Sequence, residues 1–498
     1  QNIRTSMKVS DLRLYCVNDV YKPERFSQLR TIIQSVPEDA CGMVKVLFAG
    51  DFLGGSLFAG AHRGESMIDV MNCLNIDYSL MGNHEFDYGS DRLEELIDKS
   101  NFVWLGSNVR YSVDRTLFHR TKDIDIFEIT PKSFSSSIRV GIFGVCTEMT
   151  PFLADPGDKV VFENALEHCI RCTALLKSQN CDFIIALTHL DEASDIRVAE
   201  IDGIDVIIGG HDHKTVFEKH SGSLLIKCGQ DLDQLGILDI TFDSSNPTDN
   251  LQKPSISYQF QLQEVQNAER DAIIDEKILH WRDLAMSTSG GMKDELICCV
   301  DELPLSTKTS DLRHHETTFA CYIAECVKWS YREEGCQLAI QNGGFIRRDR
   351  IYSVGSVFHT SDLQEELPFP RTPVLIKMTG KDIKLALEQM IARCPEPVGS
   401  FPHLSDGWSA EYNLNNPPFE RIVNLQYQNQ PMDISTTYLL AITDFYAEKG
   451  GDGVDAFMKK EVIASHGKTV CECAIEYLKK KEVISGKLPL RFVEIKTI

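Results

Sequence analysis

The first half of the chain carries six side chains that can bind cations, each just after a short apolar run. These candidate ligands are Asp19, Asp51, Asn83, His189, His211 and His213. Carboxylate, amide and imidazole groups suit Mg²⁺, Mn²⁺, Zn²⁺ or iron. One Asp or His at such a place is usually a turn residue or a cap, but a whole series is hard to explain as turns. The pattern therefore predicts a centre for two metal ions, which can hold a phosphate across its oxygens and activate a water.

Apolar runs and amphipathic stretches alternate around these residues, which is typical of a layered α/β domain. The predicted strands are Leu12–Val17, Val44–Ala49, Tyr78–Met81, Val140–Val145, Phe183–Leu187, Val206–Ile208 and Leu224–Lys227. The predicted helices are Arg25–Ser35, Glu65–Leu74 and Asn164–Ser178. Ligands bind beyond the carboxyl ends of the strands in such sheets. We therefore expect the six side chains at one edge of the sheet, with Asp51 on a central strand where it can bridge two ions.

The chain of 498 residues is too long for one ordinary domain, and two domains are predicted. Residues 8–263 form the α/β domain with the candidate ligands. The stretch Glu264–Met286 is charged, lacks Pro and Gly and predicts a connecting helix, so we assign 264–295 to this helix and a linker. Residues 296–498 form a second domain, with predicted helices at Thr317–Glu333 and Gly380–Arg393.

The formal net charge of -22 excludes some classes of partner. Binding nucleic acid or an anionic membrane requires a basic surface, so neither is expected. No run approaches the ~18 apolar residues of a membrane span. A small phosphorylated substrate stays compatible, because a metal cluster and a few arginines make a local positive site.

The 16 cysteines are scattered, and many lie in apolar runs where a buried free thiol is expected. No Asn-x-Ser/Thr glycosylation acceptor occurs. Together these features favour the reducing cytoplasm. Nothing in the sequence indicates an oligomeric state.

Two longer strings carry a resemblance to a known family. Gly82-Asn83-His84-Glu85-Phe86-Asp87-Tyr88-Gly89 and Ile208-Gly209-Gly210-His211-Asp212-His213 resemble motifs of the calcineurin-like metallophosphoesterase superfamily, in its 5′-nucleotidase branch. The resemblance covers nearly the whole chain. It implies a four-layer α/β/β/α metallophosphoesterase domain, joined by a helix to a smaller α/β substrate-binding domain.

The resemblance also implies residue roles and two divalent metal ions, Mn, Mg or Zn, with iron as a further option. Asp51 would bridge the ions, Asn83, His189 and His211 would complete one site, and Asp19 and His213 would belong to the other. His84 would be the catalytic imidazole, oriented by Asp87, a division of labour that the chemistry itself requires. Glu85 would be structural.

One position departs from the family pattern. The family has Asp-x-His after the first strand, whereas this chain has Asp19-Val20-Tyr21. A neutral phenol is a poor ligand unless a strongly acidic cation such as Fe(III) deprotonates it. Tyr21 could therefore be a spectator beside a weaker first site or a ligand of a ferric ion. Otherwise another residue supplies the missing ligand, or the first site is empty.

Two glycine-rich loops of the second domain resemble the nucleotide-binding loops of that family. The resemblance implies that Asn342 and Arg347 contact the substrate, that Phe369 and Phe445 stack on a base, and that Asp452 binds ribose hydroxyls. Without it, the first loop reads equally well as an ordinary hairpin turn. The match is looser here, because Val454 replaces an aromatic residue and His315 replaces an arginine.

The expected function is metal-dependent hydrolysis of phosphate monoesters, with nucleoside 5′-monophosphates first among the substrates. The same centre could instead hydrolyse nucleotide sugars, cyclic nucleotides or sugar phosphates. A third hypothesis is a catalytically weak nucleotide-binding protein. Retention of His84 and Asp87 argues against it, because a pure binding protein has no use for this pair.

Overall fold

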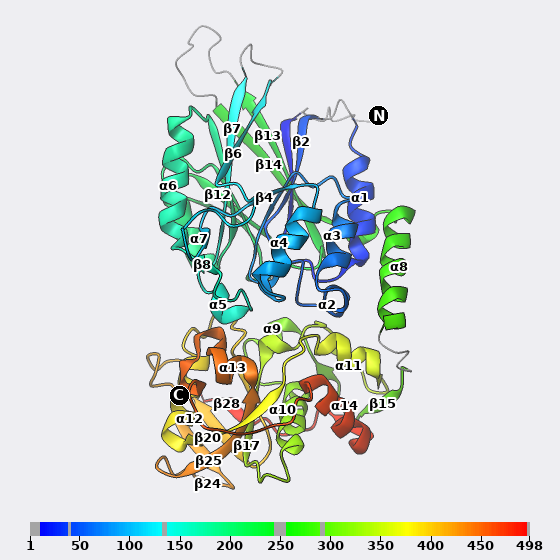
Figure 1. The fold of residues 1–498 in the computed structure, drawn as a ribbon, viewed down its shortest axis with the longest axis vertical. Coiled ribbons are helices and arrows are strands. Elements are labelled where there is room, and N and C mark those ends of the chain that lie inside the picture. Colours follow the sequence, from blue (N-terminus) through cyan, green and yellow to red (C-terminus); the bar gives the residue numbers. More distant parts are fainter. Residues whose placement is uncertain (1–9, 38–40, 132–136, 244–254, 289–293, 496–498) are drawn as a thin grey trace, which may run out of the picture. The chain divides into compact units, whose positions relative to one another are not determined.

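The computed structural model describes residues 10–37, 41–131, 137–243, 255–288 and 294–495. The chain divides into two compact units, Gln1–Gly290 and Gly291–Ile498, each with its own apolar cores (Figure 1). The glycine-containing stretch at 289–291, predicted as a linker, lies outside the described residues. Among the described residues, no helix is both long and apolar enough to span a bilayer.

The first unit contains two six-stranded sheets. One has the order β14 (Ser255–Glu264), β13 (Gln234–Asp243), β1 (Ser10–Val17), β2 (Cys41–Phe48), β3 (Tyr78–Leu80) and β4 (Val103–Leu105). The other has the order β11 (Thr215–His220), β12 (Ser223–Cys228), β10 (Val206–Gly209), β9 (Phe183–His189), β7 (Ile138–Cys146) and β6 (Ile124–Ile129). Strands β1 to β4 are parallel in the first sheet, as are β7, β9, β10 and β12 in the second.

Helices cover the outer faces of the two sheets. An apolar core between the sheets joins Leu14 and Leu47 of one to Ile185 and Ile208 of the other. A second core packs the first sheet against α1 (Phe26–Gln34), α3 (Glu65–Met71) and α4 (Ser90–Lys99). A third packs the other sheet against α6 (Ala165–Ser178) and α7 (Glu192–Ala199) (Figure 1). The order of layers is thus α/β/β/α, which confirms the predicted fold class.

The sequence located the inner strands but not their partition into two sheets. The expectation that all donors lie at one edge of a single sheet is wrong. Asp19, Asp51 and Asn83 follow strands of the first sheet, whereas the histidines follow β9 and β10 of the second. Strands β13 and β14 form a long antiparallel pair at one edge of the first sheet. Neither was predicted.

The connecting helix, α8, spans Ala272–Thr288 rather than Glu264–Met286. Strand β14 ends at Glu264, and a 3-10 turn, Val265–Asn267, and a short loop separate it from the helix. Asp271 then caps the helix, since its Oδ1 accepts the backbone N–H groups of Ile273 and Ile274 at 2.9 and 3.2 Å. The helix packs on the first unit, where Lys277 Nζ and Trp281 Nε1 both donate to Asp69 of α3.

The second unit is also mixed α/β. Its five-stranded sheet has the order β21 (Pro402–Leu404), β17 (Leu338–Asn342), β25 (Thr437–Thr443), β20 (Pro373–Thr379) and β26 (Val462–Ser465). A four-stranded sheet contains β24 (Gln430–Pro431), β23 (Ile422–Tyr427), β22 (Trp408–Tyr412) and β28 (Phe492–Glu494). Its longer helices are α10 (Thr318–Ser330), α11 (Thr360–Glu366), α12 (Gly380–Met390) and α14 (Val470–Lys481). Helices α10 and α12 lie within the two stretches predicted as helical.

Candidate metal centre

Two buried carboxylates, Asp19 and Asp51, stand just beyond the ends of β1 and β2. Both have left-handed backbone, with φ of 52° and 62°, a conformation that non-glycine residues adopt at a cost. Asp19 Oδ2 accepts from Asn18 Nδ2 at 2.7 Å and from the backbone N–H of His211 at 2.9 Å. Asp51 Oδ1 accepts the backbone N–H of His84 at 2.9 Å. The carboxylates are therefore held in place by protein donors.

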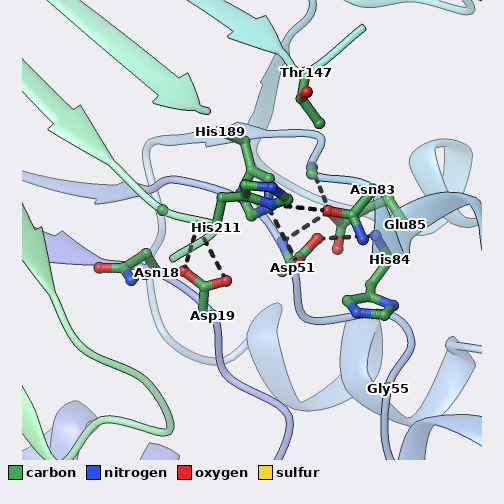
Figure 2. Close-up of polar contacts among 12 residues, drawn as sticks. Asn18, Asp19, Asp51, Gly55, Asn83, His84, Glu85, Thr147, His189 and His211 are labelled. Atoms are coloured by element: carbon green, nitrogen blue, oxygen red, sulfur yellow. Dashed lines mark hydrogen bonds and ion pairs between the residues drawn. The ribbon is translucent and has the colours of Figure 1, made fainter. Parts of the chain in front are cut away.

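Imidazoles from the second sheet reach the same place. His189 Nδ1 lies 2.8 Å from the carbonyl oxygen of Ala49, which turns Nε2 towards Asp51 Oδ2 at 3.2 Å. His211 Nδ1 lies 3.1 Å from Asn83 Oδ1. Figure 2 shows both rings grouped with Asn83 and Asp51. The ends of both sheets thus supply one cluster.

This cluster has the character of a cation site. Ligand atoms of Asp19, Asp51 and His189 all lie within 4.8 Å of one another, and His189 Nε2 is buried without a hydrogen bond among the described residues. Burial alone lowers the pKa of His189, but the charges of Asp51 and Asp19 outweigh it and raise the pKa to about 10. The carboxylates that hold a proton on this ring would hold a cation in its place. The residues therefore fit a bound metal.

Glycines allow the two sheets to approach at the centre. A Cβ atom on Gly82 would lie 2.7 Å from His189 Cε1 and closer still to Asp51 Oδ1. A Cβ atom on Gly210 would lie 2.8 Å from Asp19 Oδ2. Both glycines are therefore required by the close packing of the ligands.

Glu85 anchors the loops that carry two of the ligands. Its carboxylate accepts four backbone N–H groups, from Gly82 at 2.5 Å, Asp51 and Phe52 at 2.8 Å, and Leu53 at 3.1 Å. Burial, together with the charge of Asp51, raises its pKa to about 7. All four donors belong to the turns after β2 and β3, so Glu85 fixes the two turns relative to each other.

His84 and Asp87 form a pair beside the carboxylates. His84 Nδ1 lies 2.9 Å from Asp87 Oδ2, and the backbone N–H of Gly55 donates to the same oxygen at 3.1 Å. This contact orients the ring through Nδ1, so that Nε2 is the ring atom that can act on a substrate. Asp87 directly follows the 3-10 turn His84–Phe86, and the spacing of three residues lets the two side chains meet.

Tyr21 does not turn away from the centre. Its hydroxyl oxygen lies 2.8 Å from His213 Nε2, 3.1 Å from Asp51 Oδ2 and 3.4 Å from Asp19 Oδ1. Its ring meets the edges of the His84 and His213 rings, with centroids 5.6 and 5.4 Å apart. The hydroxyl of Tyr21 therefore lies among the candidate ligand atoms of the first site.

Lys227 supports the centre and was missed by sequence reasoning. Its buried Nζ donates to the carbonyl oxygens of Leu190 and Gly210 at 2.8 and 2.9 Å, and it lies 2.6 and 2.8 Å from carboxylate oxygens of Asp212 and Asp195. Burial lowers its pKa, but the two carboxylates outweigh burial and raise it. Leu190 follows one ligand and Gly210 precedes another, so one ammonium group fixes both loops. A lysine in the apolar run Leu224–Lys227 was the available signal.

The predicted substrate residues lie in the second unit, around two loops. Asn342 ends β17, and its Nδ2 donates to the carbonyl oxygen of Gly399 at 3.1 Å. A Cβ atom on Gly399 would lie 3.7 Å from Asp452 Oδ1, so Asn342 and Asp452 approach this glycine together. The hydroxyl of Tyr446 donates to Asp452. Burial raises the pKa of Asp452, while three arginines including Arg347 oppose that shift.

Each predicted stacking ring has an arginine close to it. The guanidinium carbon of Arg347 lies 5.5 Å from the centre of the Phe369 ring, and that of Arg371 lies 5.3 Å from the centre of the Phe445 ring. Phe445 also packs against Gly451, where a side chain would overlap its ring. These contacts place an aromatic ring and a positive charge side by side twice in the unit.

Fold and site together define a metallophosphoesterase with two domains. The chain belongs to the calcineurin-like phosphoesterases, which residues 12–215 match, and it carries a 5′-nucleotidase C-terminal domain, which residues 300–459 match. It is therefore a phosphoesterase, as the motifs predicted.

Similar proteins agree with this assignment. The trifunctional nucleotide phosphoesterase YfkN of Bacillus subtilis is 28% identical over 90% of this chain, which spans only 32% of that longer protein. The 5′-nucleotidase of Mus musculus is 24% identical over 96% of this chain and 86% of its own length. Among solved structures, the 5′-nucleotidase precursor of Thermus thermophilus has a TM-score of 0.84 at 23% identity and covers 98% of this chain and 100% of its own. That structure supports the fold.

Proposed function

We propose that the chain hydrolyses phosphate monoesters and that its preferred substrates are nucleoside 5′-monophosphates. The observation that carries the proposal is the His84–Asp87 pair beside the buried cluster of carboxylates and imidazoles. A protein that only binds phosphate needs the cluster but not an oriented imidazole. His84 Nδ1 lies 2.9 Å from Asp87, and the backbone N–H of His84 donates to Asp51.

The protein groups would act as follows. Bound cations would hold the phosphate oxygens and activate the attacking water. Asp51 would lie between the two cation sites, with Asn83, His189 and His211 on one side and Asp19 and His213 on the other. His84 Nε2 would stabilise the transferring phosphoryl group or protonate the leaving oxygen. Asp87 would keep Nδ1 protonated and the ring in position.

Support for a nucleotide comes from the second unit. Phe369 and Phe445 offer faces on which a base can stack, and base stacking on aromatic side chains contributes roughly 1–3 kcal/mol. Asn342, Arg347 and Asp452 offer polar groups for a phosphate or a ribose. The names of the mouse and Bacillus subtilis relatives point to the same class of substrate.

The test is a panel of phosphate esters with Mn²⁺, Zn²⁺ or Mg²⁺ added. We expect phosphate release to be fastest from adenosine and uridine 5′-monophosphates. Phe445→Ala should raise KM for these nucleotides and leave p-nitrophenyl phosphate almost unchanged, because only the nucleotide has a base to stack. Faster turnover of UDP-glucose, a cyclic nucleotide or glucose 6-phosphate would replace the substrate assignment. Nucleotide binding without turnover of any ester would support the weak-binding alternative.

We also propose that the chain works in a reducing compartment such as the cytoplasm. All 16 cysteines are free thiols, and most of them are buried. Secreted proteins usually use such a number of cysteines for disulfides. Fractionation of cells that produce the tagged chain tests the proposal, and recovery from the medium or the cell surface would refute it.

A further inference from the structure

We propose that Tyr21 is a ligand of the first cation site, as a phenolate, and that this site takes a trivalent ion such as Fe(III). The proposal deepens the proposed function, since it assumes that the centre binds metal. It concerns the donors Asp19, Tyr21, His213 and the shared Asp51.

The spacing of the donor atoms supports this assignment. A first-row cation binds oxygen and nitrogen at about 2.0–2.2 Å, which separates neighbouring ligand atoms by roughly 2.8–3.6 Å. Tyr21 Oη lies 2.8 Å from His213 Nε2, 3.1 Å from Asp51 Oδ2 and 3.4 Å from Asp19 Oδ1. His213 Nε2 and Asp19 Oδ1 are 3.5 Å apart. All four separations match neighbouring ligands of one ion.

The second cation site provides an internal comparison. There, His189 Nε2 lies 3.2 Å from Asp51 Oδ2, and His211 Nδ1 lies 3.1 Å from Asn83 Oδ1. The distances around Tyr21 fall in the same range. The spacing of the Tyr21 hydroxyl oxygen from its neighbours is thus similar to the spacing between the imidazole, carboxylate and amide atoms of the second site.

Hydrogen bonding alone accounts less well for this position. A phenol has one proton to donate, yet the hydroxyl of Tyr21 faces carboxylate oxygens of both Asp19 and Asp51. One of these two oxygen pairs would remain a contact between acceptors in a buried place, which is unfavourable. A cation among the donors removes this conflict, and the phenol proton passes to solvent when the ion binds.

The backbone holds Tyr21 in this position. Asp231 Oδ1 accepts the backbone N–H of Tyr21 at 2.9 Å, and the backbone N–H of Asp231 donates to the carbonyl oxygen of Asp19 at 2.8 Å. The Tyr21 side chain is buried, with 6% of the residue exposed. The hydroxyl is therefore presented to the site before an ion arrives.

Charge selects the class of ion. Asp19, Asp51 and a phenolate at Tyr21 contribute three negative charges to the first site, whereas an imidazole at position 21 would leave two. A trivalent ion balances the additional charge and is acidic enough to displace the phenol proton, which a weakly polarising ion such as Mg²⁺ is not.

The experiment measures visible absorption and the number of bound ions per chain, and it needs no substrate. The full chain is stripped of metal, loaded with Fe(III) and Zn²⁺, dialysed, and examined by visible absorption and elemental analysis. We expect two ions per chain and a visible charge-transfer band from phenolate to iron. Tyr21→Phe should lose the band and bind the first ion at least about 100-fold more weakly. Tyr21→His should hold two ions without the band.

Tyr78→Phe is the matched control. Tyr78 is a buried tyrosine of the same unit whose hydroxyl donates to Asp125, so its removal should change neither colour nor stoichiometry. Equal iron affinity in wild type and Tyr21→Phe, or bound iron without a band, would overturn the proposal. A failed substrate panel with an intact band would refute the proposed function and leave the ligand assignment in place.

Discussion

His84 Nδ1 lies 2.9 Å from Asp87 Oδ2, and that oxygen is itself held by the backbone N–H of Gly55. The imidazole is thus oriented by a carboxylate that the backbone has already positioned. In an arrangement of this kind one residue, His84, acts on the substrate and a second residue, Asp87, orients its ring.

The first prediction concerns this pair. His84→Ala should lower kcat by about 10²–10⁴-fold, the usual contribution of a positioned acid or base, with little change in substrate affinity. Asp87→Asn should lower kcat less. Because the two residues act as a unit, the double variant should be no slower than His84→Ala alone. Steady-state kinetics of the three variants checks this, and additive losses would show that Asp87 acts independently of His84.

The second prediction concerns Lys227. Lys227→Met leaves the buried Asp195 and the half-buried Asp212 without their common partner, so the free energy of unfolding should fall by about 3–5 kcal/mol. It should also weaken metal binding, because the loops after His189 and before His211 lose their shared donor. Denaturant unfolding and metal titration provide the two measurements.

Lys214→Met is the control for that variant. Lys214 pairs with Glu192, and their side chains are 38% and 29% exposed. Loss of this surface pair should cost no more than about 1 kcal/mol. If both lysine variants were equally stable, Lys227 would not support the centre in the manner described.

The third prediction concerns Gly82. Its φ lies outside the left-handed region, so an alanine is tolerated by the backbone but not by the space around it. Gly82→Ala would press a methyl group against Asp51 and the His189 ring, so we expect turnover to fall by at least about 10²-fold. Gly60→Ala is the control, since its new methyl group would meet only Tyr88 Oη at 3.4 Å. Equal turnover in both variants would contradict the close packing of the ligands.

The fourth prediction concerns pH and His403, which is fully buried in the second unit. Burial lowers its pKa to about 3, although the hydrogen bond with the carbonyl oxygen of Leu312 opposes this shift. The unfolded chain, with a pKa of about 6.5, therefore binds more protons between these two values. The contribution of His403 to the free energy of unfolding is therefore fully present above pH 6.5 and is lost as the pH falls towards 3. At pH 5 the loss is roughly 2 kcal/mol.

Thermal unfolding at pH 7 and pH 5 checks the sign and size of this effect. His403→Gln should be less stable at pH 7 and should lose less stability on acidification. His314→Gln, at an exposed histidine, should retain the pH dependence of the wild type. The prediction depends on the difference between the two proteins. An equal change in stability from pH 7 to pH 5 in wild type and His403→Gln would refute the role of His403.

The donor set was predictable from sequence because each member depends on local information. Each candidate ligand follows an apolar run, and Asp51, Asn83 and His211 also come directly after a glycine. The partition into two sheets was not predictable in this way. It depends on pairing between distant strands: β13 pairs with β1 from more than 200 residues away, and β14 pairs with β13. Apolar periodicity carries no information about pairing at that distance.

The supporting residues were also beyond sequence reasoning. The partners of Lys227 come from three separate segments, so its role exists only in the folded chain. The position of Tyr21 depends on Asp231, which lies 210 residues further along the chain. Helix α8 was misplaced at its start because residues 265–271, which form a 3-10 turn and a loop, also lack Pro and Gly and so resemble the start of a helix.

The left-handed backbone of the ligands restricts how this protein could change in evolution. Asp19, Asp51, His211 and His213 have φ between 52° and 84°, where Asn and Gly are tolerated and β-branched residues are not. A lineage that abandoned the chemistry but kept the fold would therefore favour Asn or Gly at these four positions and avoid Val, Ile and Thr, none of which occurs at positive φ among the described residues. The turns that shape the centre would thus remain recognisable in descendants that no longer hold an ion.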